Sequence, residues 1–132
     1  MDQLRFKALW LAIGIMMVTF VVYASLTPSP VAPGMSLSDK ALHIIAYFVL
    51  MGWFIQIYQQ RGTRALLGLL FIAMGVGLEF LQDYGGVRQF ELLDMLANCT
   101  GVLLAWLLVL TPFPGLLFRL EGRLVSELQA DP

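Results

Sequence analysis

Four long apolar segments, separated by short polar connections, constrain the fold of this chain more than any other feature. They cover residues 8–26, 41–58, 65–81 and 93–111, and each is close to the roughly 20 residues that a helix needs to cross a bilayer. Backbone polar groups find no water inside lipid, so such segments cross membranes as helices. The sequence therefore predicts an all-α, membrane-spanning four-helix bundle that forms a single domain over residues 1–132.

The composition supports a membrane location. Hydrophobic residues make up 59% of the chain and charged residues 13%, whereas the surface of a soluble domain needs far more charge. A net charge of -1 gives no indication of nucleic-acid binding, and we expect no nucleic-acid partner. The single cysteine, Cys99, excludes an intramolecular disulfide and a CxxC metal or redox site, and we expect no cofactor.

The connections and the tail complete the expected architecture. Residues 27–40 contain four residues that block helix continuation, namely Pro28, Pro30, Pro33 and Gly34. Residues 59–64 predict a tight polar turn, and residues 82–92 predict a flexible polar crossing. Leucines repeat on one side of residues 115–129 and arginines on the other, so we expect a C-terminal amphipathic helix that lies at the membrane interface.

Lys and Arg alternate between the two predicted faces of the membrane. The N-terminal flank, the second connection and the tail carry two each, namely Arg5 and Lys7, Arg61 and Arg64, and Arg119 and Arg123. The first and third connections carry only Lys40 and Arg88. Because cytoplasmic loops are enriched in these residues, both termini are expected in the cytoplasm. Residues 1–24 also resemble a signal peptide, whose cleavage would leave the later helices in the same orientation.

Polar residues form one stripe on each of the last three predicted helices. The three stripes are Lys40, His43 and Tyr47; Gly75, Glu79 and Gln82; and Asp94, Asn98 and Gly101. At about 100° per residue, these spacings keep each stripe on one face of its helix. All three lie at the predicted outer-leaflet end, beside Asp39 and Arg88. We therefore predict one polar site there, with His43, Glu79 and Asp94 as candidate catalytic residues and Lys40, Tyr47, Gln82, Arg88 and Asn98 as candidate binding residues.

Glu79 is the deepest acid of these stripes. A charge at the centre of a bilayer costs about 2.5–3.5 kcal/mol on insertion scales, so such groups normally pair inside the bundle. We expect Lys40, His43 or Arg88 to be the partner. Glycines on the Glu79 face would let a neighbouring helix approach closely.

Each polar residue also has a simpler structural interpretation. Lys40 could extend to the lipid headgroups, and Tyr47 could belong to the aromatic belt at the membrane surface. Asp94 could be the N-cap of its helix or a first-turn acid that the helix dipole favours. Asn98 and Gln82 could form hydrogen bonds between helices. The recurrence of one stripe on three helices at one depth favours a common site.

Three segments resemble the VanZ-like family. Residues 39–50, DKALHIIAYFVL, are similar to its DKxxHxxxYxxL signature; residues 77–82, GLEFLQ, resemble its GxxxExxQ-type segment; and residues 88–101, RQFELLDMLANCTG, resemble its R…D…N..G segment. The resemblance covers residues 38–108. It implies a small multipass protein of the bacterial cytoplasmic (inner) membrane and cell envelope, in a family whose founding member confers low-level resistance to the antibiotic teicoplanin. Leu92 and Leu93 stand where the family usually has Ser or Thr, so we assign no nucleophile.

Three classes of function follow from these residues. In the first, the site binds or modifies a lipid-linked envelope component, such as a phospholipid or peptidoglycan precursor; Lys40, His43 and Arg88 contact phosphate, and Glu79 or Asp94 handles protons. In the second, the protein is a non-catalytic accessory or scaffold subunit whose polar residues pack helices or hold a membrane-protein partner. In the third, His43, Glu79 and Asp94 bind a divalent cation in a membrane enzyme, although their spacing matches no recognised metal motif.

Overall fold

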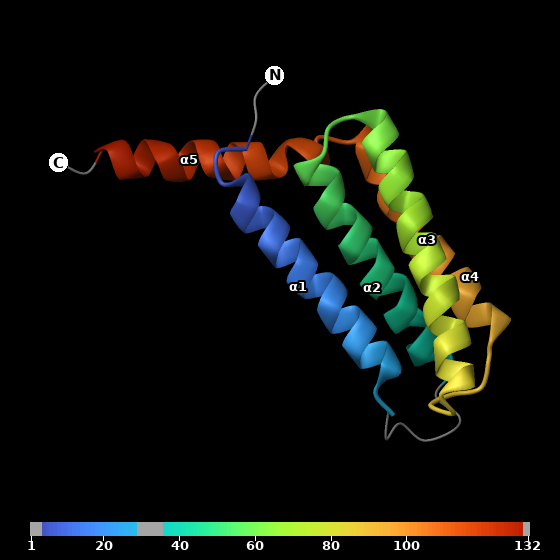
Figure 1. The fold of residues 1–132 in the computed structure, drawn as a ribbon. Coiled ribbons are helices and arrows are strands. Elements are labelled where there is room, and N and C mark those ends of the chain that lie inside the picture. Colours follow the sequence, from blue (N-terminus) through green and yellow to red (C-terminus); the bar gives the residue numbers. More distant parts are fainter. Residues whose placement is uncertain (1–3, 29–35, 131–132) are drawn as a thin grey trace.

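All regular structure in the described part of the chain is helical. The computed structural model describes residues 4–28 and 36–130. Its elements are α1 (Lys7–Leu26), α2 (Ser36–Ile57), α3 (Arg61–Tyr84), α4 (Leu92–Leu107), the short turns η1 (Leu108–Leu110) and η2 (Phe113–Gly115), and α5 (Leu116–Ala130). Helices α1 to α4 pack side by side, and α5 extends across one end of them (Figure 1). The predicted all-α class is confirmed, and four helices are long and apolar enough to cross a membrane.

Two helices extend beyond the predicted apolar segments. α2 begins at Ser36 rather than at residue 41, and α3 covers Arg61–Tyr84 rather than residues 65–81. Hydropathy marks where a chain is apolar, whereas a formed helix grows into polar flanks because each added residue gains a hydrogen bond without a new nucleation step. The turn predicted at residues 59–64 is therefore shorter than expected. Of the residues predicted to break the chain before α2, Pro30, Pro33 and Gly34 lie outside the described residues.

The fourth helix ends earlier than predicted. α4 ends at Leu107 rather than at residue 111, and the chain tightens into η1. Thr111 then adopts extended backbone angles, with φ -113° and ψ 172°, which is the conformation that a following proline favours. Because Pro112 cannot continue a helix, the chain turns here and starts α5.

The closest contact in the bundle joins α2 and α4, which run parallel with their N-termini at the same end (Figure 1). A methyl group added to Gly101 of α4 would lie 2.4 Å from the carbonyl oxygen of Ile44 in α2. This separation is shorter than any real contact, so only glycine fits at this position. α2 and α4 therefore touch through their backbones.

Two glycines of α3 allow α4 to pack closely against α3. A methyl group added to Gly75 would lie 3.0 Å from the side-chain nitrogen of Asn98, and one added to Gly68 would lie 3.0 Å from the ring of Trp106. Both glycines share a face with Glu79. The prediction that this face allows a neighbouring helix to approach closely is confirmed.

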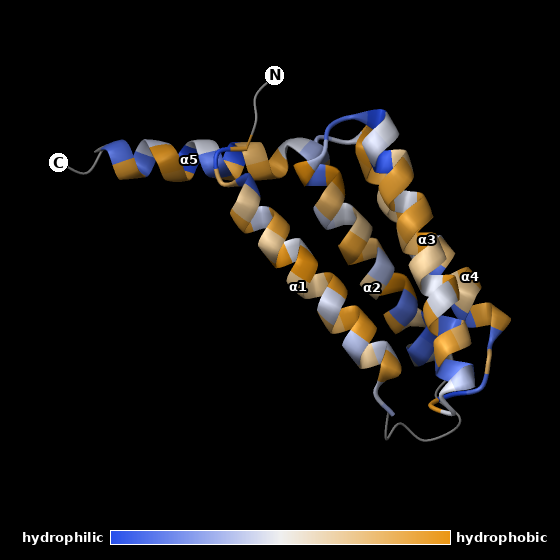
Figure 2. Cartoon of the chain, in the orientation of Figure 1, coloured by the Kyte–Doolittle hydropathy of each residue, from blue (hydrophilic) through white to orange (hydrophobic). Residues whose placement is uncertain are grey.

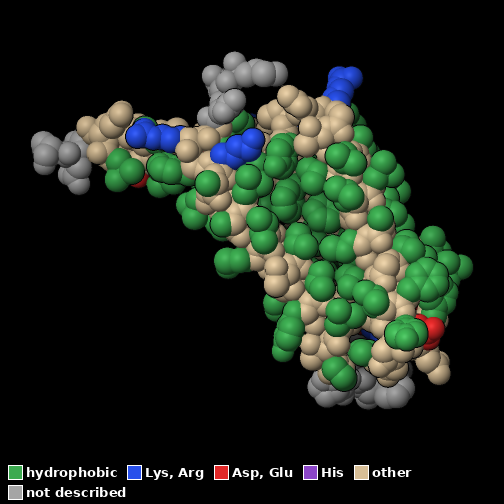
Figure 3. Space-filling view, viewed as in Figure 1, with side chains coloured by type: hydrophobic (Ala, Val, Ile, Leu, Met, Phe, Trp, Pro, Cys, Tyr) green, Lys and Arg blue, Asp and Glu red, His purple; other side chains and the backbone are tan. Residues whose placement is uncertain are grey.

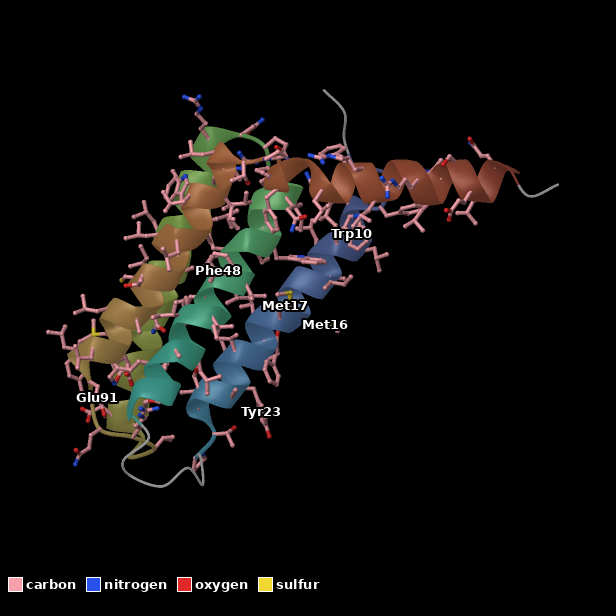
Figure 4. All side chains as sticks on the ribbon, turned by 180° about the vertical axis from the view of Figure 1, so that it is seen from behind. Trp10, Met16, Met17, Tyr23, Phe48 and Glu91 are labelled. Atoms are coloured by element: carbon pink, nitrogen blue, oxygen red, sulfur yellow. The ribbon has the colours of Figure 1, made fainter. Side chains whose placement is uncertain are left out.

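The buried core surrounds α2. Its members come from α2, α3 and α4, and they are Tyr47, Leu50, Met51, Phe54, Ile55, Phe71, Val102 and Ala105. α1 covers this core with only part of its surface: Met17 packs against it, whereas Met16 is 68% exposed on the other side of the helix (Figure 4). An apolar helix that exposes so much of itself is what a membrane-spanning helix in contact with lipid requires.

A buried acid fastens α5 to the start of α1. The carboxylate of Glu121 accepts hydrogen bonds from the backbone N–H groups of Arg5 and Phe6, at 2.7 and 2.8 Å, and from the indole N–H of Trp10 at 2.7 Å. The first N–H groups of a helix lack partners within it and favour a negative charge nearby. Glu121 supplies that charge from the far end of the sequence and fixes where α5 leaves the bundle.

The two ends of the bundle differ in their polar residues. Apolar residues make up most of the length of α1 to α4, and hydrophilic residues gather at the end of the bundle where α2 begins and α3 ends (Figure 2). On the face shown in Figure 3, Lys and Arg side chains lie at the end that carries α5. We call this end the α5 end. We call the opposite end, where α2 and α4 begin, the cluster end. The predicted interfacial position of α5 stays a prediction; the leucines that it exposes are Leu116, Leu120, Leu124 and Leu128.

Candidate functional site

The parallel α2–α4 pair brings polar side chains together in register. Lys40 of α2 donates a hydrogen bond of 2.6 Å to Asp94 of α4. One turn further along both helices, Nδ1 of His43 lies 2.9 Å from the side-chain oxygen of Asn98. Because the helices run in the same direction, residues three or four apart on each meet at successive levels. The sequence prediction that these four residues share one place is confirmed.

Asp94 lies at the centre of this group, and its side chain is completely buried. Its Oδ1 bonds to Lys40, while its Oδ2 lies 3.2 Å from Nη2 of Arg88 and 3.8 Å from Nε2 of His43. Oδ2 accepts no hydrogen bond from the described residues, so Arg88 contacts it as a charge rather than as an aligned donor. Asp94 is not the N-cap of α4, which is Glu91, but it lies in the first turn of α4, where the helix dipole favours a negative charge.

Two further acids complete the arrangement. Glu91 accepts a second hydrogen bond from Lys40, at 2.7 Å, and Asp39 forms an ion pair with Arg88. Glu91 lies at the cluster end, close to the starts of α2 and α4 (Figure 4). We use the name Asp94 cluster for Asp39, Lys40, His43, Arg88, Glu91, Asp94 and Asn98. Lys40 therefore pairs with acids instead of simply extending to the headgroups.

Glu79 adjoins this cluster but pairs differently from the prediction. Its side chain is buried, and its Oε1 accepts a hydrogen bond of 2.8 Å from the backbone N–H of Glu91. No cationic side chain among the described residues lies within salt-bridge distance of it. At this level α3 faces the chain that leads into α4, so the donor that Glu79 meets is a backbone group. Its catalytic role, like those proposed for His43 and Asp94, stays a prediction.

Two candidate binding residues lie outside the cluster. Gln82 is buried and donates a hydrogen bond to the carbonyl oxygen of Ser25, at the end of α1. This fits its alternative interpretation as a hydrogen-bonding residue between helices. Tyr47 is 2% exposed within the core, so it does not belong to an aromatic belt, and its hydroxyl bonds to none of the described residues.

The cluster also offers ligand atoms for a cation. One atom each from Asp39, His43 and Asp94 lies within 4.8 Å of the others. With Asn98 accepting from Nδ1, His43 directs the lone pair of Nε2 toward Asp94, which is how a second partner commonly orients a metal-binding histidine. Asp39 thus replaces Glu79 in the ligand set predicted from the sequence. In the arrangement described here, however, both carboxylates are already paired with Lys40 or Arg88.

Two members of the cluster, Arg88 and Glu91, lie in the connection before α4, and an ion pair favours the charged form of each. The hydrogen bond from Lys40 lowers the pKa of Glu91 below its ordinary value. The hydrogen bond to Asp39 raises the pKa of Arg88. Each shift arises because a partner of opposite charge favours ionisation. Within the cluster, Glu91 and Arg88 are therefore bound as ions to Lys40 and Asp39.

Sequence reasoning missed three buried or paired groups. Glu91 stands one helical turn before Asp94, a spacing that could have marked it as part of the stripe. Arg64 stands four residues before Gly68, on the line that continues to Gly75, and it is 5% exposed. Glu121 stands four residues after a buried leucine on the apolar side of α5, and this spacing could likewise have marked it as buried.

Comparison with known proteins gives a relative but no function. Over 101 residues, the chain is 31% identical to a protein of Schizosaccharomyces pombe that is named only as uncharacterized. The match covers 74% of this chain and 60% of that protein, so the chain spans less than two thirds of the relative's length. No protein-family model matches the chain, and no solved structure matches it. The relative places a similar sequence in a eukaryote.

Proposed function

We propose that this chain is a multipass integral membrane protein whose Asp94 cluster binds the phosphate-bearing headgroup of a lipid or lipid-linked molecule. The observation that carries this proposal is the pairing of one buried carboxylate with two cations. Lys40 lies 2.6 Å from one oxygen of Asp94, and Arg88 lies 3.2 Å from the other. Two cations that are already held side by side bind an anion with little further loss of conformational freedom.

The second partner of each cation is nearer to the surface than Asp94. Glu91, beside Lys40, has a side chain that is 44% exposed, and Asp39, beside Arg88, one that is 26% exposed. A phosphate could replace either carboxylate while Asp94, with no exposed surface, keeps the cations in position. Arginine suits this exchange because its planar group donates two parallel hydrogen bonds to phosphate as well as to carboxylate.

The greater exposure of Glu91 supports it, rather than Asp39, as the carboxylate that a phosphate would replace. Three carboxylates face Lys40 and Arg88 in the cluster, so a phosphate would add charge to a site that is already negative. The Glu91 side chain can turn outward without moving α4, because its backbone N–H stays bonded to Glu79. We therefore expect Glu91→Gln to bind a phosphate headgroup more tightly than the natural protein.

The proposed orientation follows from the basic residues. Lys and Arg are enriched on cytoplasmic faces, so the α5 end and both termini face the cytoplasm and the Asp94 cluster faces the outer leaflet. On the motifs at residues 39–50, 77–82 and 88–101 we propose a VanZ-like protein of a bacterial cytoplasmic membrane. The ligand is defined by its phosphate chemistry, which bacterial and eukaryotic membranes share.

Native mass spectrometry of the full chain in detergent tests this proposal. The protein would be titrated with phosphatidylglycerol and, separately, with diacylglycerol of the same acyl chains. We expect selective binding of the phosphate-bearing lipid, and a loss of about tenfold in its affinity in both Lys40→Gln and Arg88→Gln, the change expected for one charge-assisted hydrogen bond. Arg123→Gln, an exposed cation on α5, is the matched control and should bind normally.

Other results would overturn the proposal. Equal lipid binding by the natural protein, Lys40→Gln and Arg88→Gln would show that the cluster does not hold the headgroup. A co-purifying protein that is lost in these same variants would favour the accessory-subunit alternative. Binding of Mn²⁺ or Zn²⁺ that depends on Asp39 and His43, without lipid selectivity, would favour the cation site.

A further inference from the structure

A groove between α3 and α4 at the α5 end differs from the rest of the apolar surface. It has a volume of about 750 Å³. Most of its wall is apolar and comes from the second half of α4 and from η1, and its two cationic side chains come from the first turn of α3. The lining residues are Arg61, Arg64, Thr100, Leu103, Leu104, Trp106, Leu107, Val109 and Leu110.

Arg64 carries a buried charge in this groove. It is 5% exposed, and its three hydrogen bonds go to neutral oxygens: the carbonyls of Tyr58 and Ile55, at 2.6 and 2.8 Å, and the side chain of Gln59 at 2.8 Å. A guanidinium has five N–H donors, and Nη1 donates to none of the described residues. Within residues 4–28 and 36–130, no carboxylate lies within 4 Å of Arg64. A buried cation without an anionic partner is costly.

The surroundings of Arg64 add positive charge. Arg61 is exposed one turn earlier and lines the same groove. The first turn of α3 contains no acid, and no side chain caps it, so the positive end of the helix dipole is also uncompensated here. The mouth of the groove therefore attracts an anion.

We propose that this groove binds one anionic phospholipid, with its phosphate at Arg61 and Arg64 and one acyl chain along α4. The chain would run from Leu110 past Leu107 toward Thr100, a distance of about 15 Å at the rise of a helix. One leaflet of the hydrocarbon core is also about 15 Å thick. The two cationic side chains at the mouth of the groove match the phosphate of a phospholipid, and the apolar wall along α4 matches its acyl chain.

This site is separate from the Asp94 cluster, which lies at the opposite end of the bundle. The lipid would complete the hydrogen bonding of a side chain that joins the end of α2 to the start of α3. We therefore expect bound lipid to stabilise this end of the bundle.

The test uses the full chain in detergent, titrated with phosphatidylglycerol and with zwitterionic phosphatidylcholine of the same acyl chains, with native mass spectrometry as the readout. Besides any phosphatidylglycerol held at the Asp94 cluster, we expect one tightly bound phosphatidylglycerol whose affinity falls about tenfold in Arg61→Gln, as the loss of one charge-assisted hydrogen bond predicts. Leu107→Trp, which fills the groove, should abolish it. Leu96→Trp, at an exposed leucine of α4 outside the groove, and Arg123→Gln, at an exposed cation of α5 outside the groove, should retain it.

Three outcomes would overturn this inference. Normal phosphatidylglycerol binding by Leu107→Trp would show that the groove is not the site. Equal affinity for phosphatidylcholine, unchanged in Arg61→Gln, would exclude selection by charge. A dimer that dissociates in Leu107→Trp, with no bound lipid in the natural protein, would identify a second copy of the chain as the occupant.

Discussion

The buried carboxylate of Glu79 accepts a hydrogen bond of 2.8 Å from the backbone N–H of Glu91. Glu91 is the N-cap residue directly before α4, so an acid within α3 fixes where the next helix starts. That start in turn places Asp94 one turn later, beside Lys40 of α2. A single hydrogen bond thus connects three helices at the cluster end.

The contact between Glu79 and Glu91 predicts a difference between two substitutions. Glu79→Gln keeps an oxygen acceptor of the same shape, whereas Glu79→Leu leaves the N–H of Glu91 without a partner. We expect Glu79→Leu to lower the free energy of unfolding by about 1–3 kcal/mol and Glu79→Gln to lower it by less. Unfolding by SDS titration in mixed micelles measures both. Equal losses would show that the hydrogen bond is not what Glu79 contributes.

Removal of the charge on Asp94 should destabilise the cluster. Asp94→Asn leaves Lys40 and Arg88 close together without the anion between them, and breaking a buried ion pair costs about 3–5 kcal/mol. We expect the lower end of this range, because both cations are partly exposed. The double variant Asp94→Asn/Lys40→Gln should lose less than the sum of the two single variants. Additive losses in this double-mutant cycle would mean that the two side chains do not interact.

The backbone contact at Gly101 predicts a strong response to one methyl group. Gly101→Ala would place a carbon 2.4 Å from the carbonyl oxygen of Ile44, which must separate α2 from α4 and should cost about 1–3 kcal/mol or more. Gly77→Ala is the matched control, because an added methyl group there meets nothing within 4 Å. It should be neutral or slightly stabilising. Thermal unfolding of the two variants in the same detergent compares them.

The pair of Lys40 and Glu91 predicts a dependence on pH. Lys40 holds the pKa of Glu91 below its ordinary value of 4.5, so the folded state binds this proton less readily than the unfolded state. The contribution to stability is therefore complete above pH 4.5 and is lost as the pH falls through the lowered pKa. Because the Glu91 side chain is 44% exposed and its charge is screened by solvent, we expect about 1 kcal/mol or less. Melting temperatures between neutral and acidic pH should fall less steeply for Glu91→Gln than for the natural protein.

Cysteine labelling tests the proposed orientation with two sites on the same helix. In a Cys99→Ala background, Gly62→Cys places a thiol at the α5 end and Tyr84→Cys places one at the cluster end, where Tyr84 is 93% exposed. An impermeant thiol reagent added to intact cells should label only Tyr84→Cys. Labelling of Gly62→Cys alone would reverse the orientation and place the Asp94 cluster in the cytoplasm.

The helices could be predicted from the sequence because each is a long apolar segment of the length that crossing a bilayer would require. Their ends could not. Ser36 and Arg61 start helices within polar segments, where hydropathy gives no signal and helix continuation decides the boundary. The end of α4 shows the reverse case, since Pro112 stops the regular helix before its apolar segment is complete.

The residues of the candidate site could be predicted in part, because helical spacing determines which side chains share a face. Spacing does not determine which neighbour covers that face at each depth. Lys40 and Asp94 therefore meet as expected, whereas Gln82, on the predicted stripe of α3, meets the end of α1 through Ser25. Arg64 and Glu121 bond mainly to backbone groups, and such partners leave no trace in a pattern of side chains.

The contact between α2 and α4 also sets the order in which the molecule can be assembled during synthesis. α2 emerges from the ribosome well before its principal partner, and α3 intervenes. Until the segment around Gly101 has been made, Lys40 and His43 have neither Asp94 nor Asn98 to bond to. The polar face of α2 therefore lacks its partners until α4 has been made, and the bundle can close only after its last long apolar helix has been synthesised.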